Sequence, residues 1–149
     1  MRAVVQRVSK ASVKINALTT GSIQKGVVVL LGIHATDSLD ELRWMANKII
    51  NLRIFEDNNG KMNRSLTDID GEMLIVSQFT LYGDCRKGRR PGYSSAAPPE
   101  LAKPLYEQYI EEVKSRQIRV ATGTFGANME VEIINDGPVT LLLDSDKTF

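Results

Sequence analysis

The chain contains one continuous apolar run, Gly26-Val27-Val28-Val29-Leu30-Leu31-Gly32, which continues into Ile33. A strand that faces solvent on one side alternates apolar and polar residues, but this run has no polar position. It therefore predicts a central strand over Val27–Ile33 that is buried on both faces. The other elements of the sheet can be placed outward from it.

Further strand signals lie on both sides of this run. Arg2–Val8 and Ala11–Ile15 alternate and are rich in Val and Ile, which is typical of half-buried strands. Met73–Phe79 is a second strongly apolar segment. Two more strands are predicted near the end of the chain, over Met129–Ile134 and Val139–Leu143.

Two helices are predicted. Ser38 begins the first, and Glu41 follows three residues later, as in a capping box. The apolar residues after them have helical spacing and are expected to face the core: Leu42, Met45, Ala46, Ile49 and Leu52. The second helix runs from about Glu100 or Pro104 to Lys114. Its start is open because proline fits a first turn but disrupts a helix interior.

The strands outnumber the helices and do not alternate with them, so a parallel βαβ fold is not expected. We expect an α+β domain: a mostly antiparallel sheet or open barrel with two helices packed on one side. The chain has 149 residues, 42% of them hydrophobic, and neither an internal repeat nor a long linker, which fits a single domain over residues 1–149. The polar tail Asp144–Phe149 is expected to fray.

Net charge, cysteine content and hydropathy narrow the class of protein. A net charge of +1 gives no overall field toward nucleic acid or membrane. Cys85 is the one cysteine, so no internal disulfide can form, which suits a reducing compartment. The apolar runs are too short to span a bilayer, and the N-terminus lacks the apolar block of a signal peptide. A cytoplasmic protein without membrane contact is expected.

The groups used by ordinary hydrolases and metal sites are scarce. His34 is the only histidine, and nothing places it with a serine and a carboxylate, so we interpret it as a loop or surface residue. No base is evident that would make Cys85 a nucleophile. No paired-cysteine or H-x-x-x-H pattern occurs, and the glycines form neither a P-loop nor a dinucleotide fingerprint. Neither a metal nor a cofactor is expected.

Two short motifs follow predicted strands: Ser77-Gln78-Phe79-Thr80 and Asn135-Asp136-Gly137-Pro138-Val139-Thr140. The first offers hydroxyls, an amide and backbone N–H groups, and the second places a Gly-Pro bond before a strand. Each also has a plain structural interpretation, as strand and as turn. X-Pro bonds are cis in only about 5–6% of cases, so the geometry of this bond stays open.

Taken together, these segments closely resemble the D-aminoacyl-tRNA deacylases, and the resemblance covers nearly the whole chain. The segments that carry it are Val5–Val8, Gly26–Gly32, Asn51–Phe55, Gly60–Asn63, Val76–Leu81, Lys87–Pro91, Gly123–Met129 and Asn135–Thr140. The most specific part is the pair SQFT and NDGPVT in this order and at this separation. The chain departs from the family after Leu143 and at Tyr82–Cys85, outside both motifs.

The resemblance implies a homodimer that hydrolyses the ester joining a D-amino acid to the 3′ end of tRNA. It implies a cis Gly137-Pro138 bond whose loop enters the partner subunit's pocket, where Ser77–Thr80 builds the other wall. Arg7 would brace the loop through charge-assisted hydrogen bonds to carbonyls. Carbonyls of the loop would hold the substrate amine, so that an L side chain strikes the backbone, a D side chain points to open space, and glycine passes.

Catalysis in such a site would need few side chains. Backbone N–H groups of Gln78, Phe79 and Thr80 would stabilise the oxyanion, and water, aided by the terminal ribose hydroxyl, is the expected nucleophile, with Thr80 orienting it. Phe125 and Met129 either line an apolar slot near the terminal adenosine or belong to the core.

A basic cluster supports two alternatives. Arg86, Lys87, Arg89 and Arg90 form solvated loop charge by default, or else contact tRNA phosphates. The cluster would also suit a nucleic-acid-binding module without catalysis, although the near-zero net charge disfavours that as the main role. A generic esterase that uses Cys85 or Thr80 is the other alternative.

Overall fold

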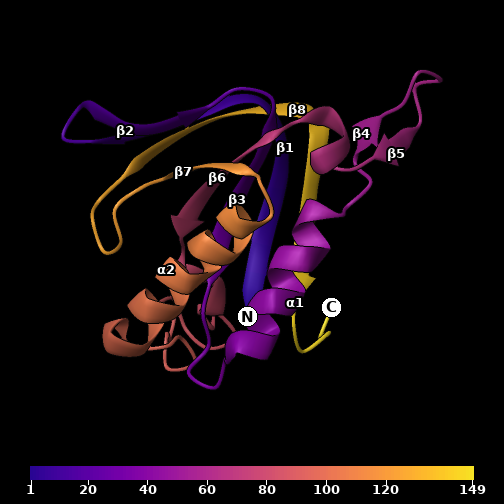
Figure 1. Cartoon of the computed structure of the whole chain (residues 1–149). Coiled ribbons are helices and arrows are strands. Elements are labelled where there is room, and N and C mark those ends of the chain that lie inside the picture. The colour runs from indigo at the N-terminus through magenta and orange to yellow at the C-terminus, as the bar shows by residue number, and fades with distance from the viewer.

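The sheet is organised around its first strand, which is 14 residues long and pairs with three neighbours (Figure 1). The computed structural model describes the whole chain, Met1–Phe149. The strands of the main sheet are β1 (Arg2–Ile15), β2 (Leu18–Ile23), β3 (Gly26–Gly32), β6 (Glu72–Ser77), β7 (Arg119–Thr122) and β8 (Glu130–Asp144). β2, β3 and β8 all pair antiparallel with β1, whereas β6 and β7 continue the sheet from β3 in parallel.

The predicted central strand is confirmed. β3 lies between β1 and β6, and six of its seven residues are buried. The sheet curls into a nearly closed barrel, because β2 approaches β7 at the far end of the strand order. A Cβ on Gly21 would stand 2.6 Å from the carbonyl oxygen of Thr122, so only glycine allows this approach.

The predicted α+β class is confirmed, with a mixed sheet. Between β3 and β6 the chain passes through α1 (Leu39–Ile50), and between β6 and β7 it passes through α2 (Pro99–Ser115). Both helices lie on one side of the sheet (Figure 1). The expectation that strands do not alternate with helices is wrong for β3, α1, β6, α2 and β7, because these three strands are parallel and a helix lies in each connection. Each connection also carries long irregular segments, so this alternation is not visible as a pattern in the sequence.

The capping box of α1 forms as predicted. The Ser38 hydroxyl accepts from the N–H of Asp40, and the Glu41 carboxylate accepts from the N–H of Ser38 at 2.8 Å. The predicted core face is also found, except that Leu52 lies beyond the helix end and is half-buried. α2 begins at Pro99 and contains Pro104 in its interior. The carbonyl that loses its donor there belongs to Glu100, which is exposed and can bond to water.

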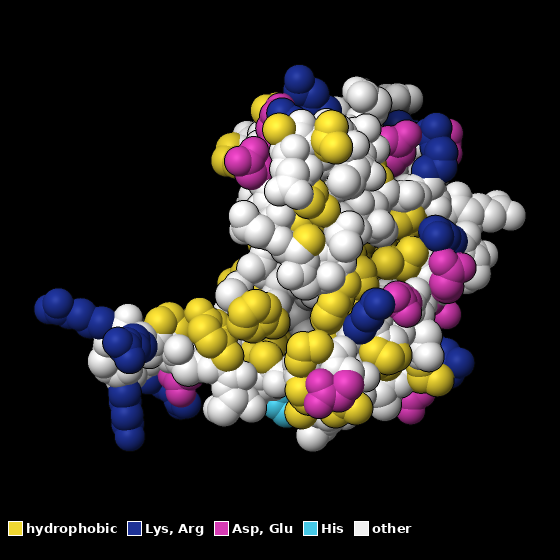
Figure 2. Space-filling model, turned by 90° about the vertical axis from the view of Figure 1, so that its left-hand side faces the viewer, with side chains coloured by type: hydrophobic (Ala, Val, Ile, Leu, Met, Phe, Trp, Pro, Cys, Tyr) yellow, Lys and Arg dark blue, Asp and Glu magenta, His cyan; other side chains and the backbone are white.

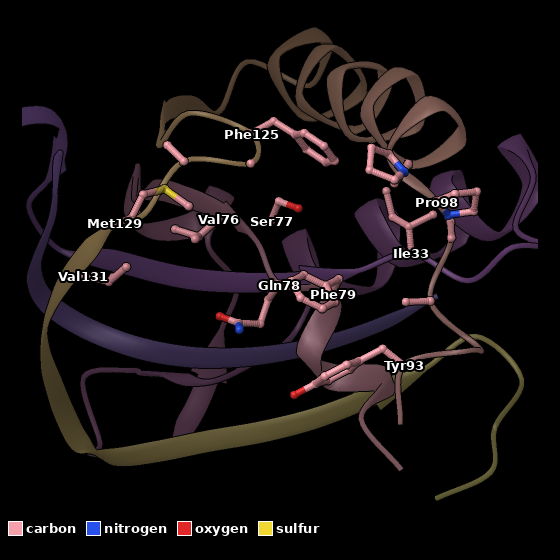
Figure 3. Close-up of a pocket in the computed structure, with 16 residues that line it drawn as sticks. Ile33, Val76, Ser77, Gln78, Phe79, Tyr93, Pro98, Phe125, Met129 and Val131 are labelled. Atoms are coloured by element: carbon pink, nitrogen blue, oxygen red, sulfur yellow. The ribbon is translucent and has the colours of Figure 1, made fainter. Parts of the chain in front are cut away.

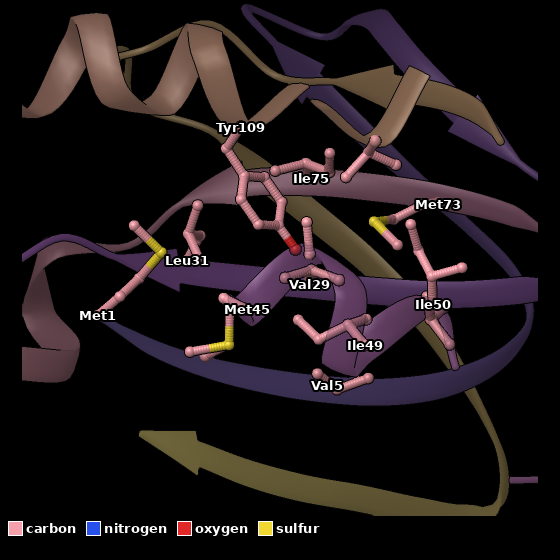
Figure 4. Packing of buried hydrophobic residues seen from close by; sticks show 14 of the residues in the cluster. Met1, Val5, Val29, Leu31, Met45, Ile49, Ile50, Met73, Ile75 and Tyr109 are labelled. Atoms are coloured by element: carbon pink, nitrogen blue, oxygen red, sulfur yellow. The ribbon is translucent and has the colours of Figure 1, made fainter. Parts of the chain in front are cut away.

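The main core lies between the sheet and the two helices. It is a cluster of 23 buried residues, and a second cluster of seven fills the other face of the curled sheet. Figure 4 shows Tyr109 of α2 and Met45 and Ile49 of α1 pointing toward Val29 and Ile75 of the sheet. One core under both helices accounts for the single domain.

Several element boundaries differ from the predicted ones. β1 and β8 are each one continuous strand where two were predicted, and β6 ends at Ser77, two residues early. The remaining elements were not predicted: β2, β7, the hairpin strands β4 (Phe55–Glu56) and β5 (Met62–Arg64), and the 3-10 helices η1 (Thr67–Ile69) and η2 (Phe79–Tyr82).

The tail does not fray at its first two residues. Asp144 is 4% exposed, and the N–H of Ser145 donates to the carbonyl of Met1 at 2.9 Å. Arg2 also bonds to the Asp144 carboxylate at 3.3 Å. The expectation of a frayed tail is therefore wrong for Asp144 and Ser145, because these two residues continue the pairing of β8 with the start of the chain. None of the helices has the length and apolar content needed to cross a bilayer.

Candidate active site

A pocket of about 530 Å³ opens at the carboxyl end of β6 (Figure 3). It lies between η2, the first turn of α2 and the turn that precedes β8. Its lining is mostly apolar, with 11 hydrophobic residues among 16: Ile33, Val76, Ser77, Gln78, Phe79, Tyr93, Ala96, Ala97, Pro98, Pro99, Ala102, Phe125, Gly126, Ala127, Met129 and Val131. Hydrophobic side chains gather along a hollow in one face of the molecule, and Lys and Arg side chains project beyond one end (Figure 2).

The first motif forms one wall of this pocket. β6 brings Ser77 to the rim, and the N–H of Gln78 donates to the carbonyl of Leu31 on β3 at 2.8 Å. The prediction that the Gln78 N–H is an oxyanion donor is therefore wrong, because the sheet already uses this N–H. η2 then begins at Phe79. Because the first N–H groups of a helical turn have no acceptor within that turn, those of Phe79 and Thr80 are free to bond elsewhere. The wall therefore offers main-chain donors rather than acidic or basic side chains.

Thr80 lies beside the pocket but not in its lining. Its hydroxyl oxygen accepts a hydrogen bond from the side-chain amide of Gln78. This contact holds the two side chains of the motif together. The hydrogen bond to the Thr80 hydroxyl comes from an amide, not from a carboxylate or imidazole, so no base is placed to take its proton.

The opposite wall comes from the turn between β7 and β8. Phe125 and Met129 both line the pocket, and both are half-buried and pack against the core clusters. The two predicted roles for them, pocket lining and core packing, are therefore compatible. The turn is closed by a hydrogen bond from the N–H of Ala127 to the carbonyl of Thr124 at 3.1 Å.

Sequence reasoning missed a third wall. Tyr93 packs edge-on against Phe79, with 5.1 Å between the ring centroids, and Ala96 to Pro99 follow it along the rim. The N–H of Ala97 fixes this segment by donating to the carbonyl of Ile33 at 2.9 Å. The sequence feature that could have indicated this wall is Tyr93, the one aromatic residue in the irregular stretch from Gly83 to Pro99.

The lining contains no Asp, Glu, His, Lys, Arg or Cys. Nowhere in the structure do three or more His, Cys, Asp or Glu side chains form a group that could hold a metal ion. The chemistry that the pocket itself can supply is hydrogen bonding from main-chain N–H groups, the Ser77 hydroxyl and the Gln78 amide. Such an arrangement can stabilise negative charge on a carbonyl oxygen.

The second motif lies within β8, outside the pocket lining. Asn135 is opposite Val8 and Thr140 is opposite Gln6, so residues 136–139 between them form a loop that bulges out of the strand opposite Arg7. The Gly137-Pro138 peptide bond is cis, and both residues are exposed. Arg7, 7% exposed, donates from Nε to the carbonyl of Asp136 at 3.1 Å and from Nη1 to the carbonyl of Ile54 at 2.6 Å. Arg7 thus holds the chain directly before Gly137 against β1. Within one chain, however, the two motifs do not share a cavity.

The basic cluster occupies an exposed hairpin. Asp84 and Gly92 exchange backbone hydrogen bonds of 2.7 and 2.9 Å at its base. The Arg86 guanidinium bonds to the Asp84 carboxylate at 2.7 Å and lowers the pKa of that group below its ordinary range. Arg86 is therefore already paired, whereas Lys87, Arg89 and Arg90 form no ion pair in this chain and are free for an external anion: no acidic group lies within 4.0 Å of their charges.

His34 and Cys85 line a separate polar groove. The Nδ1 atom of His34 accepts from the N–H of Thr36 at 3.2 Å and lies 2.8 Å from its hydroxyl oxygen. The His34 ring packs near that of Tyr82, with 5.3 Å between the centroids. No serine and carboxylate complete a triad with this imidazole. Cys85 is an exposed free thiol.

Comparison with known proteins extends this description. Residues 4–144 match the model of the D-Tyr-tRNA(Tyr) deacylase family. The chain is 60% identical to a D-aminoacyl-tRNA deacylase of Thermosipho africanus and 62% identical to one of Desulfotalea psychrophila, in each case over the full length of both chains.

Two solved structures share the fold. The c-Myc DNA Unwinding Element Binding Protein is 44% identical, with a TM-score of 0.91 over 97% of this chain and 98% of its own. A structure described as a "probable eukaryotic D-amino acid tRNA deacylase" has a TM-score of 0.83 over 95% and 97% of the two chains. At 19% identity the second shows likeness of fold alone. From the family match and the full-length relatives, the chain belongs to the D-Tyr-tRNA(Tyr) deacylase family and is a hydrolase of D-aminoacyl-tRNA.

Proposed function

We propose that the protein acts as a homodimer in which the Gly137-Pro138 loop of one subunit completes the Ser77–Thr80 pocket of the other. The observation that carries the proposal is that the pocket offers hydrogen-bond donors but lacks a charged acceptor. Its first wall has hydrogen-bond donors for the ester carbonyl, but its lining has no charged acceptor for the substrate ammonium group. Exposed carbonyls of the β8 loop are suited to supply those acceptors.

The outer edge of β8 supports a second copy as the partner. β8 has 15 residues and pairs with β1 alone, so a long edge of backbone N–H and C=O groups stays open. Ile134 and Leu142 on this strand are 42% and 61% exposed, and Phe79 at the pocket rim is 55% exposed. An open edge with exposed apolar side chains is the kind of surface that dimers bury.

The loop would act as the chiral filter. With the substrate amine held by main-chain carbonyls and its ester carbonyl held by N–H groups of η2, only the Cα hydrogen and the side chain can exchange places. An L side chain would then strike the Gly137-Pro138 backbone, whereas a D side chain would point away. Glycine has no side chain to exclude, so glycyl-tRNA would also be hydrolysed.

The hydrolysis step would use water. The N–H groups of Phe79 and Thr80 would stabilise the oxyanion, a device that contributes about 3–4 kcal/mol per donor in a well-studied protease. The terminal ribose hydroxyl would assist the attacking water, and Thr80, bonded to Gln78, would orient the site. In a Thr80→Ala variant, turnover should persist at a reduced rate. An acyl-enzyme trapped in the unchanged protein would contradict this assignment.

The tRNA would lie across the pocket and the basic hairpin. The apolar wall of Phe125 and Met129 suits the terminal adenosine, and the unpaired Lys87, Arg89 and Arg90 suit acceptor-stem phosphates. This substrate implies work in the cytoplasm.

A second candidate, nucleic-acid binding without catalysis, is favoured by the exposed basic hairpin and by the name of the 44% identical solved relative. The net charge of +1 disfavours it as the main role. Tight binding of duplex DNA, together with no loss of ester from any aminoacyl-tRNA, would decide for it.

The main experiment compares matched substrates. The protein is incubated with D-tyrosyl-, L-tyrosyl- and glycyl-tRNA, and release of the amino acid is followed. Fast loss of the D and glycyl esters with the L ester intact is expected. Equal cleavage of the D and L esters would refute the filter. A monomer in solution that keeps full chiral selection would refute the shared site.

A further inference from the structure

Tyr106 of α2 contacts two walls of the pocket from behind without lining it. It is 3% exposed, and its hydroxyl donates to the carbonyl of Ile75 on β6 at 2.8 Å. Its ring lies 5.8 Å from that of Phe125, centroid to centroid, at 48°. Burial raises the pKa of Tyr106 to about 12, so the hydroxyl stays a donor at any physiological pH. One buried side chain thus links the strand that carries Ser77 to the opposite wall.

The hydrogen bond from Tyr106 to Ile75 lies at the point where β7 stops pairing with β6. β7 pairs with β6 only as far as Ile75 opposite Thr122, and the chain then leaves the sheet for the turn that holds Phe125. Beyond this point β6 continues to Ser77 with β3 as its only partner. The Tyr106 hydroxyl therefore donates to the last residue of β6 that β7 pairs with, two residues before Ser77.

We infer that Tyr106 is a positioning residue for ester hydrolysis: its hydroxyl fixes the end of β6, and its ring fixes Phe125. The inference rests on the proposed function, because it takes this pocket as the active site. The two parts of the side chain act on different walls. The hydroxyl sets the position of Ser77 and of the N–H groups that follow it, and the ring sets the wall that receives the nucleoside.

Tyr109 provides a matched comparison. It lies three residues further along the same helix and is also fully buried, but its hydroxyl has no hydrogen-bond partner. Removing the Tyr109 hydroxyl takes away the same atom from the same helix and core without breaking a hydrogen bond. Any change seen at Tyr106 and not at Tyr109 is then due to the bond to Ile75.

The test is steady-state kinetics on D-tyrosyl-tRNA with four variants. Tyr106→Phe should lower kcat about tenfold with KM unchanged, which matches about 1.4 kcal/mol of lost transition-state stabilisation. Tyr106→Leu, which also removes the ring, should lower kcat and raise KM. Tyr109→Phe should change neither. Phe125→Ala should raise KM if this pocket is the active site. Circular dichroism and Tm verify that each variant folds.

The outcomes separate the two proposals. If Phe125→Ala raises KM but Tyr106→Phe lowers only Tm and leaves kcat unchanged, Tyr106 is a structural residue and the inference is wrong. If neither Phe125→Ala nor Tyr106→Leu affects the kinetics, the pocket is not the active site and the proposed function fails. Equal loss of kcat in Tyr106→Phe and Tyr109→Phe would also refute the inference, because only one of these hydroxyls has a partner.

Discussion

Replacing Gly137 with alanine tests the chiral filter most directly. Gly137 has φ of +126°, a backbone conformation that L side chains rarely adopt. A Cβ placed there would stand 2.8 Å from Nη2 of Arg7 and 2.9 Å from Cγ2 of Val139. Arg7 cannot move aside freely, because its other nitrogens bond to the carbonyls of Ile54 and Asp136. The loop itself therefore has to shift.

The size of the effect follows from these contacts. The unfavourable φ costs about 1–3 kcal/mol, and loosening one charge-assisted hydrogen bond of Arg7 costs about 1.5–3 kcal/mol. A typical domain has about 5–15 kcal/mol of stability, so the variant should still fold, with a lower Tm. If the shifted loop loses one hydrogen bond to the substrate amine, kcat/KM for D-tyrosyl-tRNA falls about ten- to a hundredfold.

The assay measures kcat/KM on D- and L-tyrosyl-tRNA for Gly137→Ala and for a control, Gly60→Ala. Gly60 also has positive φ, +71°, but a Cβ there meets nothing within 4 Å, and it lies in the turn between β4 and β5. The Gly60→Ala control also forces an L residue into a positive φ, but it does not alter the Gly137-Pro138 loop, so its kinetics should be unchanged. A Gly137→Ala variant that is less stable yet keeps its rate and its D-to-L ratio would refute the role of this loop.

Three further outcomes are expected. Alkylation of Cys85, or Cys85→Ser, should leave kcat/KM unchanged, because the thiol lies outside the pocket; loss of turnover would favour the generic esterase. Replacing Arg89 and Arg90 with Gln should weaken binding of all tRNAs alike and make the slope of log affinity against log salt shallower by about 0.7–0.9 for each phosphate that is no longer neutralised; an unchanged slope would exclude a role for these two residues in phosphate binding. Burial raises the pKa of Asp144, but bonds from Thr148, Asp146 and Arg2 bring it below its ordinary 3.8, so its contribution to stability is present above that pH and lost as pH falls further. Asp144→Asn should therefore lower stability to urea at pH 7 and much less at pH 3; an equal loss at both would contradict this.

Much of the fold follows from local patterns. The continuous apolar run over Val27–Leu31 predicts a strand that is buried on both faces, and β3 is that strand. The side chains of Ser38 and Glu41 accept hydrogen bonds from backbone N–H groups at the start of α1, so four residues are enough to specify where this helix begins. The two motifs of the candidate site follow predicted strands, but each also had a plain structural interpretation, and the resemblance to the D-aminoacyl-tRNA deacylases was what assigned them to a site.

The rest depends on contacts that have no local signature. β2 is polar and exposed, and it becomes a strand by pairing with β1. β7 has four residues, and its parallel partner is reached only after the whole of α2. Tyr93 and Ala96–Pro99 join the site because a long loop folds back over η2. The sequence pattern of that loop shows only that it is irregular.

The absence of acidic and basic side chains from the pocket lining affects how the rate of hydrolysis depends on pH. No carboxylate, imidazole, ammonium or guanidinium lies in its lining, so the pocket walls of this chain bring no titrating acid or base to the reaction. The proton equilibria left to shape the rate are those of the bound ester's own amine and of the attacking water. The bell-shaped profile of an acid–base pair should be missing, and the pH at which turnover changes should move with the amino acid being released rather than with the enzyme that releases it.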